Sequence, residues 1–224
     1  IFFECFELTT IYTPKFIAEG TEIGLYNEFL DENGSGVTAI TSEYCNEILT
    51  GERIVIVEND ENGIPDTNLY NMLLELCDEN EDGILRTNEL KTVFDLAVSE
   101  SQISSIKGLE YCKNLRSLTI IDNKLNDLTP LQSLSNLESL CLIQTDITDI
   151  TPISSLASLK ELYLGENKIK DITPLQKLTN LEFLQLSDNE IKNITPLAKL
   201  VNLWGLDISN NQVSNISTVS KLKN

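Results

Sequence analysis

The sequence predicts an α/β solenoid, a right-handed superhelix of parallel β-strands with 3-10 or extended turns on its convex side. From residue 115 onward the chain can be written in rows of 22 residues without insertion or deletion. The rows are 115–136, 137–158, 159–180, 181–202 and 203–224. Apolar residues recur at positions 1, 4, 6, 11, 14, 17 and 20 of these rows. A repeat of constant length indicates coils that stack on their neighbours and share one core.

Each row contains a short Leu-x-Leu-like segment, which in the central row is Leu162 and Leu164. Successive side chains of a strand point to opposite faces, so these two leucines point into the coil and the residues between them point outward. Position 9 is asparagine in every row but one: Asn123, Asn167, Asn189 and Asn211, with Thr145 as the exception. A side-chain amide at this bend can bond backbone groups that the turning chain leaves unpaired. We therefore expect a ladder of asparagines along the stack.

The second half of the rows carries proline at position 16, at Pro130, Pro152, Pro174 and Pro196. Proline fixes φ and disfavours α-helix in the residue before it, so the convex side should be 3-10 or extended. The pattern L-x-x-L-x-L-x-x-N followed by D-I-T-P-L resembles the leucine-rich repeats of internalin-type bacterial surface proteins. The resemblance covers about 63–224. It implies a leucine-rich repeat solenoid that binds protein or glycan and has no enzymatic activity.

Residues 63–92 are predicted to form a helical cap. Ile64-Pro65-Asp66 opens a helix over 67–77, whose apolar face is Leu69, Met72, Leu73 and Leu76. The helix leads into a loop with the spacing of an EF-hand, which supplies the six or seven oxygens that calcium prefers. The expected ligands are Asp78, Asn80, Asp82, the Ile84 carbonyl, a water near Arg86, and both oxygens of Glu89. We expect calcium to be a structural cofactor here. The alternative is a loop that keeps the turn but has lost the ion, and the basic residue at position 9 favours that alternative.

The segment 93–114 is a degenerate row that already keeps the repeat register, so the array spans 93–224 with one degenerate and five regular repeats. The helix that follows the EF-hand-like loop therefore has little more than one turn before the first strand, Leu96 to Val98. The cap thus has no room for a moving lever and should sit directly on the solenoid. Its arrangement, with Ile103 to Tyr111 after the loop, is similar to cap segments of bacterial surface leucine-rich repeat proteins.

Residues 1–62 are predicted to be a small β-rich or mixed module. The segments 1–17 and 53–60 are rich in the β-branched and aromatic residues that favour strands, and 41–51 resembles a short helix ended by glycine. The segment 31–36 imitates the first half of a calcium loop. Position 12 of that loop is Ser42 rather than glutamate, so a polar turn is the better interpretation.

The five cysteines are scattered without metal-ligand spacing, which argues against a disulfide framework. Cys5 and Cys45 could pair within the first module. Cys77 and Cys112 fall at apolar positions and should be buried, whereas Cys141 falls on the outward face of its strand.

The composition argues against several classes of function. A net charge of −19 opposes binding to nucleic acid and to anionic membranes, and no apolar run is long enough to insert directly into a bilayer. The chain has no histidine and no motif that pairs a nucleophile with a base, so we expect no enzymatic activity. Because the chain starts with Ile1 and stops at the last position of a repeat, we expect it to be part of a longer protein.

Binding is therefore expected on the outward strand residues. The candidates are Glu161, Tyr163, Glu182, Phe183, Gln185, Trp204 and Asp207. Aromatic residues in three successive rows are typical of binding hot spots. They are equally typical of a cross-strand ladder that stabilises the sheet, and the sequence leaves both interpretations open.

The function that this resemblance implies is protein or glycan recognition by the concave face of a bacterial cell-surface or secreted protein, such as an adhesin. An extracellular or cell-surface location follows from the same resemblance. Two alternatives remain: an intracellular scaffold or regulatory subunit, and the binding module of a larger secreted enzyme. The sequence does not name the partner.

Overall fold

The computed structural model describes residues 29–30, 36–37, 54–99 and 103–222. The chain divides into two compact units, Ile1–Val55 and Ile56–Asn224. In the first unit, β1 (Phe29–Leu30) pairs in antiparallel fashion with β2 (Gly36–Val37). The strand predicted over 1–17, the helix predicted over 41–51 and the possible pairing of Cys5 with Cys45 lie outside the described residues.

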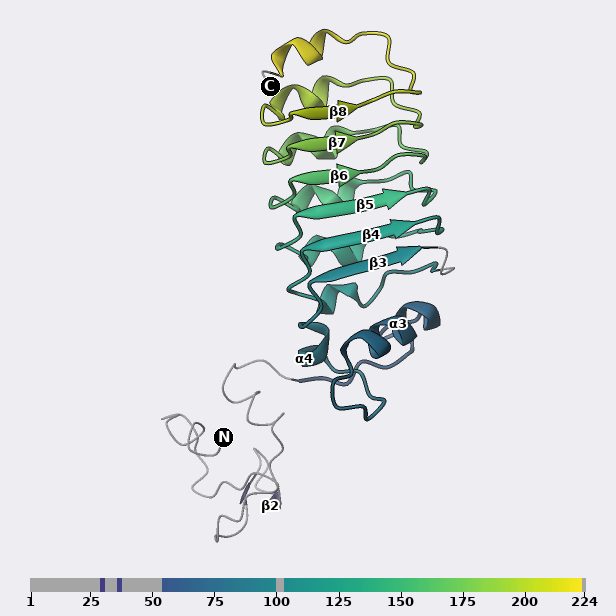
Figure 1. Cartoon of the computed structure of the whole chain (residues 1–224), viewed down its shortest axis with the longest axis vertical. Helices are drawn as coiled ribbons and strands as arrows, with labels where there is room; N and C mark the ends of the chain where they lie inside the picture. The colour runs from purple at the N-terminus through teal and green to yellow at the C-terminus, as the bar shows by residue number, and fades with distance from the viewer. Residues whose placement is uncertain (1–28, 31–35, 38–53, 100–102, 223–224) are drawn as a thin grey trace. The chain divides into compact units, whose positions relative to one another are not determined.

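The second unit is a leucine-rich repeat solenoid, as predicted. Its six strands form one parallel sheet in chain order (Figure 1). They are β3 (Asp95–Ser99), β4 (Ser117–Ile121), β5 (Ser139–Ile143), β6 (Glu161–Tyr163), β7 (Phe183–Gln185) and β8 (Gly205–Asp207). Paired residues are separated by one repeat, as in Asp95 with Ser117 and Ser117 with Ser139. The degenerate row therefore supplies the first strand of the array.

The side of each coil opposite the sheet is a 3-10 helix, which confirms the prediction from the prolines. These helices are η1 (Leu109–Tyr111), η2 (Thr129–Ser133), η3 (Thr151–Ser155), η4 (Thr173–Lys177), η5 (Thr195–Lys199) and η6 (Ser217–Lys221). Proline lies in the first turn of η2 to η5, where its missing N–H removes no helical bond.

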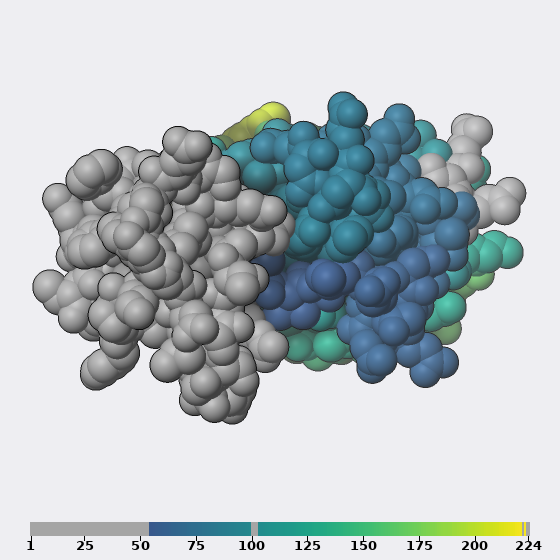
Figure 2. Space-filling view, turned by 90° about the horizontal axis from the view of Figure 1, so that it is seen from below, coloured from purple at the N-terminus to yellow at the C-terminus, as the bar shows by residue number. Residues whose placement is uncertain are grey.

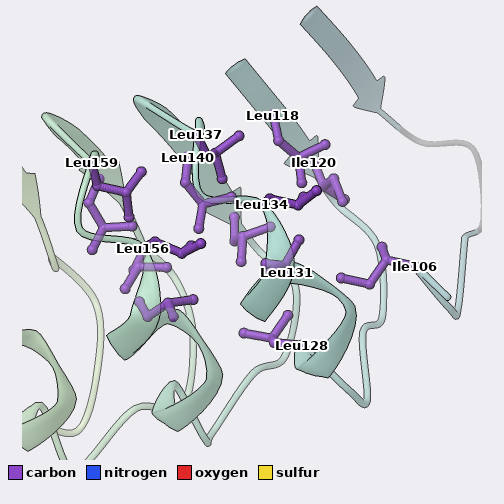
Figure 3. Close-up of a cluster of buried hydrophobic side chains, with 14 of the residues drawn as sticks. Ile106, Leu118, Ile120, Leu128, Leu131, Leu134, Leu137, Leu140, Leu156 and Leu159 are labelled. Atoms are coloured by element: carbon purple, nitrogen blue, oxygen red, sulfur yellow. The ribbon is translucent and has the colours of Figure 1, made fainter. Parts of the chain in front are cut away.

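The apolar positions of the rows form one continuous core from Val57 in the cap to Leu203. Figure 3 shows how Leu118 and Leu140 of the sheet point toward Leu131 and Leu134 of the 3-10 side. Each coil completes its neighbours' core, so stability depends on contacts between adjacent coils.

The predicted asparagine ladder is present in the interior. Asn189 donates from Nδ2 to the carbonyl of Leu164 in the preceding coil (2.8 Å) and accepts at Oδ1 from the N–H of Ile169 (2.9 Å). A second polar ladder at position 22 was not predicted. There Asn136, Asn180 and Asn202 each donate to a carbonyl of the preceding coil at 2.9–3.0 Å.

The cap contains α3 (Thr67–Cys77) and α4 (Thr87–Leu90), and its blue atoms cover the near end of the solenoid when seen from below (Figure 2). The helix α3 has the predicted bounds, but Leu76 is exposed. The i, i+4 spacing of Leu69, Leu73 and Cys77 places these three in the core instead.

Residues 56–62 belong with the cap. The N–H of Val57 donates to the carbonyl of Leu85 at 2.8 Å, and Ile56 forms an isolated bridge with Arg86. The division between the units therefore falls between 55 and 56 rather than between 62 and 63. The strand predicted over 53–60 is reduced, within its described part, to this single bridge.

Two contacts fix the cap on the first coil. Gly108 has φ of 103°, and a β-carbon there would lie 2.2 Å from Cγ1 of Ile64. Asp66 caps α3 with Oδ1, while its Oδ2 accepts from the N–H and hydroxyl of Ser104 at 2.8 and 3.1 Å. Burial alone would raise the pKa of Asp66, but hydrogen bonds from backbone N–H groups hold it below its ordinary value.

The described cysteines, Cys77, Cys112 and Cys141, are free thiols. Cys77 and Cys112 are buried as predicted, and burial raises the pKa of each to about 12. Cys141 is half-buried rather than exposed, because it is paired in register with Thr119 on one side and Tyr163 on the other.

Candidate functional sites

The outward face of the sheet carries three aromatic rings in contact, which we call the aromatic surface: Tyr163 on β6, Phe183 on β7 and Trp204 just before β8. The Tyr163 and Phe183 ring centroids are 5.1 Å apart, and those of Phe183 and Trp204 are 5.3 Å apart. These distances are typical of favourable aromatic pairs. Trp204 is nevertheless 64% exposed, so the rings form a ladder and still present apolar area to solvent.

The ladder depends on Gly205, which the sequence analysis did not single out. Gly205 pairs in register with Phe183, and a β-carbon on Gly205 would lie 2.4 Å from Cδ2 of the phenylalanine ring. The absence of that carbon lets the ring lie across β8 toward Trp204. A glycine at an outward strand position often marks such a close approach, and this was the available signal.

The polar candidates differ in how far they are engaged within the protein. Gln185 accepts from the N–H of Gly165 at 3.0 Å and donates to Ser187, and Asp207 accepts from the N–H and hydroxyl of Ser209 at 2.9 and 2.7 Å. These two side chains therefore help to shape turns. Glu161 has one long contact, 3.4 Å, with the Tyr163 hydroxyl, and its carboxylate lies exposed beside the rings.

A groove of about 580 Å³ runs along the start of the strands beside the aromatic surface. Its lining is Phe94, Asn114, Arg116, Asn136, Glu138, Ser158, Lys160, Asn180, Glu182 and Asn202. Position 2 of successive rows supplies charges of alternating sign, and Lys160 Nζ lies 2.6 Å from Glu138 Oε2. The Arg116 guanidinium lies 5.7 Å from the Phe94 ring centroid. The alternation at position 2 was visible in the sequence but was not interpreted there.

The EF-hand-like loop has the turn that its spacing requires. Asp78 Oδ2 accepts from the N–H of Gly83 (2.8 Å), and Asn80 Oδ1 accepts from the N–H of Asp82 (2.9 Å). Gly83 has φ of 75°, the left-handed region that a residue without a β-carbon adopts at little cost. The side chains at loop positions 1 and 3 thus point into the loop and hold its backbone.

Arg86 places its guanidinium among the expected ligands. Nη2 lies 2.7 Å from Asp82 Oδ2, and Nη1 donates to Asp82 Oδ1 and to the Ile84 carbonyl, each at 3.1 Å. Nη1 is also 3.7 Å from Oε1 of Glu89. The hydrogen bond from Arg86 is the main reason that the pKa of Asp82 lies below its ordinary value.

Glu89 is buried and closes the loop. Its Oε2 accepts from the N–H of Arg86 at 2.8 Å, and its Oε1 accepts from Nδ2 of Asn80 at 3.3 Å. Burial raises the pKa of Glu89 above its ordinary value, although the hydrogen bond and the charge of Arg86 act in the opposite direction.

The donor set fits calcium in part. Oδ1 of Asp78 is buried and has no hydrogen-bond partner, so one expected ligand atom is free to accept a cation. Yet across residues 54–99 and 103–222 no three acidic, histidine or cysteine side chains gather as a metal site. The Arg86 guanidinium instead holds Asp82 and the Ile84 carbonyl.

Comparison with known proteins agrees with the fold. The family model described as "Leucine Rich repeats (2 copies)" matches residues 135–177 and 179–224. An internalin from Listeria monocytogenes is similar to this chain, with 30% identity and a TM-score of 0.67. The match covers 70% of this chain and 47% of that internalin, so the chain spans about half of its length. No curated protein matches.

Two further solved structures resemble the fold alone. A leucine-rich repeat protein from Leptospira interrogans has 23% identity and a TM-score of 0.57, covering 61% of this chain and 36% of that one. The ectodomain of a plant membrane receptor kinase from Arabidopsis thaliana, in complex with Casparian strip integrity factor 2, has 24% identity and a TM-score of 0.54. It covers 60% of this chain and 18% of that chain. The chain thus has a leucine-rich repeat solenoid fold and is similar in structure to an internalin. In its described part no helix has the length and apolar character needed to cross a membrane.

Proposed function

We propose that this solenoid recognises a protein partner through the outward face of its sheet, with the aromatic surface at the centre of the interface. The observation that carries the proposal is the exposure of Trp204 at the end of a stacked aromatic ladder. Large aromatic side chains held rigidly in place bury much area on binding and lose little conformational entropy. The sheet supplies that rigidity before the partner arrives.

The charged groove favours a protein over a neutral glycan as the ligand. Arg116, Glu138, Lys160 and Glu182 alternate in sign along it, which suits a peptide surface with complementary charges. We propose that the protein acts without catalysis as a surface or secreted adhesion molecule, in line with its likeness to an internalin. Both alternatives would use the same face of the sheet. The scaffold alternative would place it inside the cell, whereas the enzyme-module alternative would make it the binding module of a larger secreted enzyme.

A double variant tests the interface. Three labelled chains are applied to arrays of purified ectodomains and of glycans: wild type, Tyr163→Ser/Trp204→Ser and the control Val201→Ser. The control alters another exposed apolar residue that is not one of the three rings. Two hot-spot residues at about 2 kcal/mol each predict, if their effects add, a loss of about 1,000-fold in the double variant. Protein ligands bound equally by all three chains would contradict the proposal, and ligands confined to the glycan array would overturn the choice of a protein partner.

Stability separates binding from scaffolding. Loss of two aromatic pairs should lower the free energy of unfolding by about 1–3 kcal/mol. A loss of more than ~4 kcal/mol would indicate a structural ladder. Protease treatment of intact and lysed source cells then tests location: cleavage on intact cells supports an extracellular protein, and protection until lysis supports the scaffold alternative.

We also propose calcium as a structural cofactor of the cap, because the unpartnered Oδ1 of Asp78 has the chemistry of a ligand. Asp78, Asn80, Asp82, the Ile84 carbonyl and Glu89 would hold the ion, with a water near position 9. At 1 mM calcium and a Kd of about 0.1 mM, binding would stabilise the fold by about 1.4 kcal/mol. Chelation with EGTA should then lower the melting temperature by roughly 3–5 °C. An equal melt with EGTA and with calcium would contradict this role.

A further inference from the structure

We infer that Arg86 is a built-in cation of the cap loop: its guanidinium neutralises the loop at low calcium, and calcium binds only by displacing it. The second part of the inference rests on the calcium proposal, whereas the first part does not. Asp78, Asp82 and Glu89 lie within one short loop, and Glu89 is 6% exposed. Asp82 and Glu89 both lie next to the Arg86 guanidinium, and two carboxylates that share one cation in this way would repel each other without it.

The guanidinium is placed where a cation is needed. It contacts loop positions 5, 7 and 12, which are Asp82, the Ile84 carbonyl and Glu89. The contact to Asp82 is bidentate, and the Arg86 side chain is 11% exposed. The guanidinium is planar and weakly hydrated, and it binds the carboxylate through two parallel hydrogen bonds. Its interaction with Asp82 is therefore stronger than that of an ordinary surface ion pair.

The backbone of Arg86 makes contacts that do not involve the guanidinium. Its N–H donates to Oε2 of Glu89, and its main chain forms the isolated bridge to Ile56. These contacts belong to the main chain, so a substitution that removes the guanidinium leaves the start of α4 in place. The role of the side chain can therefore be tested separately from that of the main chain.

Arginine and calcium exclude each other in this loop. An ion would need the same oxygens of Asp82 and Ile84 that the guanidinium now occupies, and two cations within a few ångströms repel strongly. Oδ1 of Asp78 has no hydrogen-bond partner and would be the first ligand offered to an incoming ion. Displacement opposes calcium binding, so the wild-type site is weaker than its ligand set alone would make it.

Arg86→Gln tests the inference, with Lys113→Gln as a control that changes the net charge equally outside the loop. Calcium-free chains are titrated with calcium chloride in a calorimeter and are melted in EGTA and in 5 mM calcium. We expect Arg86→Gln to bind calcium about tenfold or more tightly than wild type, within the usual range of coupling between competing ligands. In EGTA it should melt several degrees lower, and calcium should restore the melt. The control should match wild type throughout.

The outcomes separate the two proposals. If neither chain binds calcium but Arg86→Gln melts lower in EGTA, the built-in cation stands and the calcium proposal fails. If Arg86→Gln matches wild type in calcium affinity and in EGTA melting, the inference is overturned. Adding Asp78→Asn to Arg86→Gln should abolish calcium binding, and calcium binding retained in that double variant would place the ion elsewhere and also overturn the inference.

Discussion

Asn167 provides the sharpest test of the asparagine ladder, because alanine at this position removes contacts from two coils at once. Its Oδ1 accepts from the N–H of Thr145 (3.1 Å) and of Ile147 (3.2 Å), and its Nδ2 donates to the carbonyl of Leu142 (2.7 Å). The side chain is 8% exposed, so water would not replace these partners freely. Asn167→Ala therefore leaves two buried N–H groups without their acceptor.

The magnitude follows from those two groups. An unsatisfied buried donor costs about 1–3 kcal/mol, so two of them predict a loss of about 2–6 kcal/mol in the free energy of unfolding. A loss near 3 kcal/mol is large against the 5–15 kcal/mol that typical domains possess.

Urea unfolding followed by tryptophan fluorescence measures the loss. The chain has one tryptophan, Trp204, which lies in the array and so reports on the solenoid. Asn180→Ala is the matched control, since Asn180 is exposed and makes a single bond, 2.9 Å, to the carbonyl of Ala157. That control should lose less than ~1.5 kcal/mol. The reasoning would be refuted if Asn167→Ala lost no more than the control.

Three further changes test the cap and the aromatic surface. Gly108→Ala should destabilise the fold by more than ~3 kcal/mol in urea unfolding, because of the positive φ and the clash with Ile64. Gly83→Ala, where no atom lies near the added carbon, should lose only the ~1–2 kcal/mol of backbone strain. Equal losses would argue against the clash. Asp66 has a lowered pKa when folded, so its contribution is present above the unfolded value near 3.9 and is lost as the pH falls through the folded value. Asp66→Asn should thus have a shallower fall in stability below about pH 4 than wild type, and parallel pH profiles would argue against the Ser104 contact. Gly205→Ala should displace the Phe183 ring, shift the Trp204 emission and weaken partner binding, and an unchanged spectrum would show that the ring does not depend on the glycine.

The array could be predicted from the sequence because its information is local and repeated. A coil of fixed length forces each apolar position to the same place in the stack, so strand register, buried leucines and the asparagine ladder follow from one row. The 3-10 side follows equally from the prolines, which act within their own turn. The exposure of Leu76 was missed because four apolar residues at helical spacing do not by themselves reveal which side of the helix another element covers.

The structure alone decided what depends on side-chain direction or on distant partners. Asp66 meets Ser104 across 38 residues, and the Phe183 ring lies over Gly205 because one β-carbon is missing there. The contacts of Arg86 likewise depend on the direction of its side chain. The sequence by itself determined an EF-hand spacing with a basic residue at position 9, since ligand types and their order are local. Only the tertiary structure decided where that guanidinium points, because the contacts of a flexible side chain depend on which groups the folded backbone places near it.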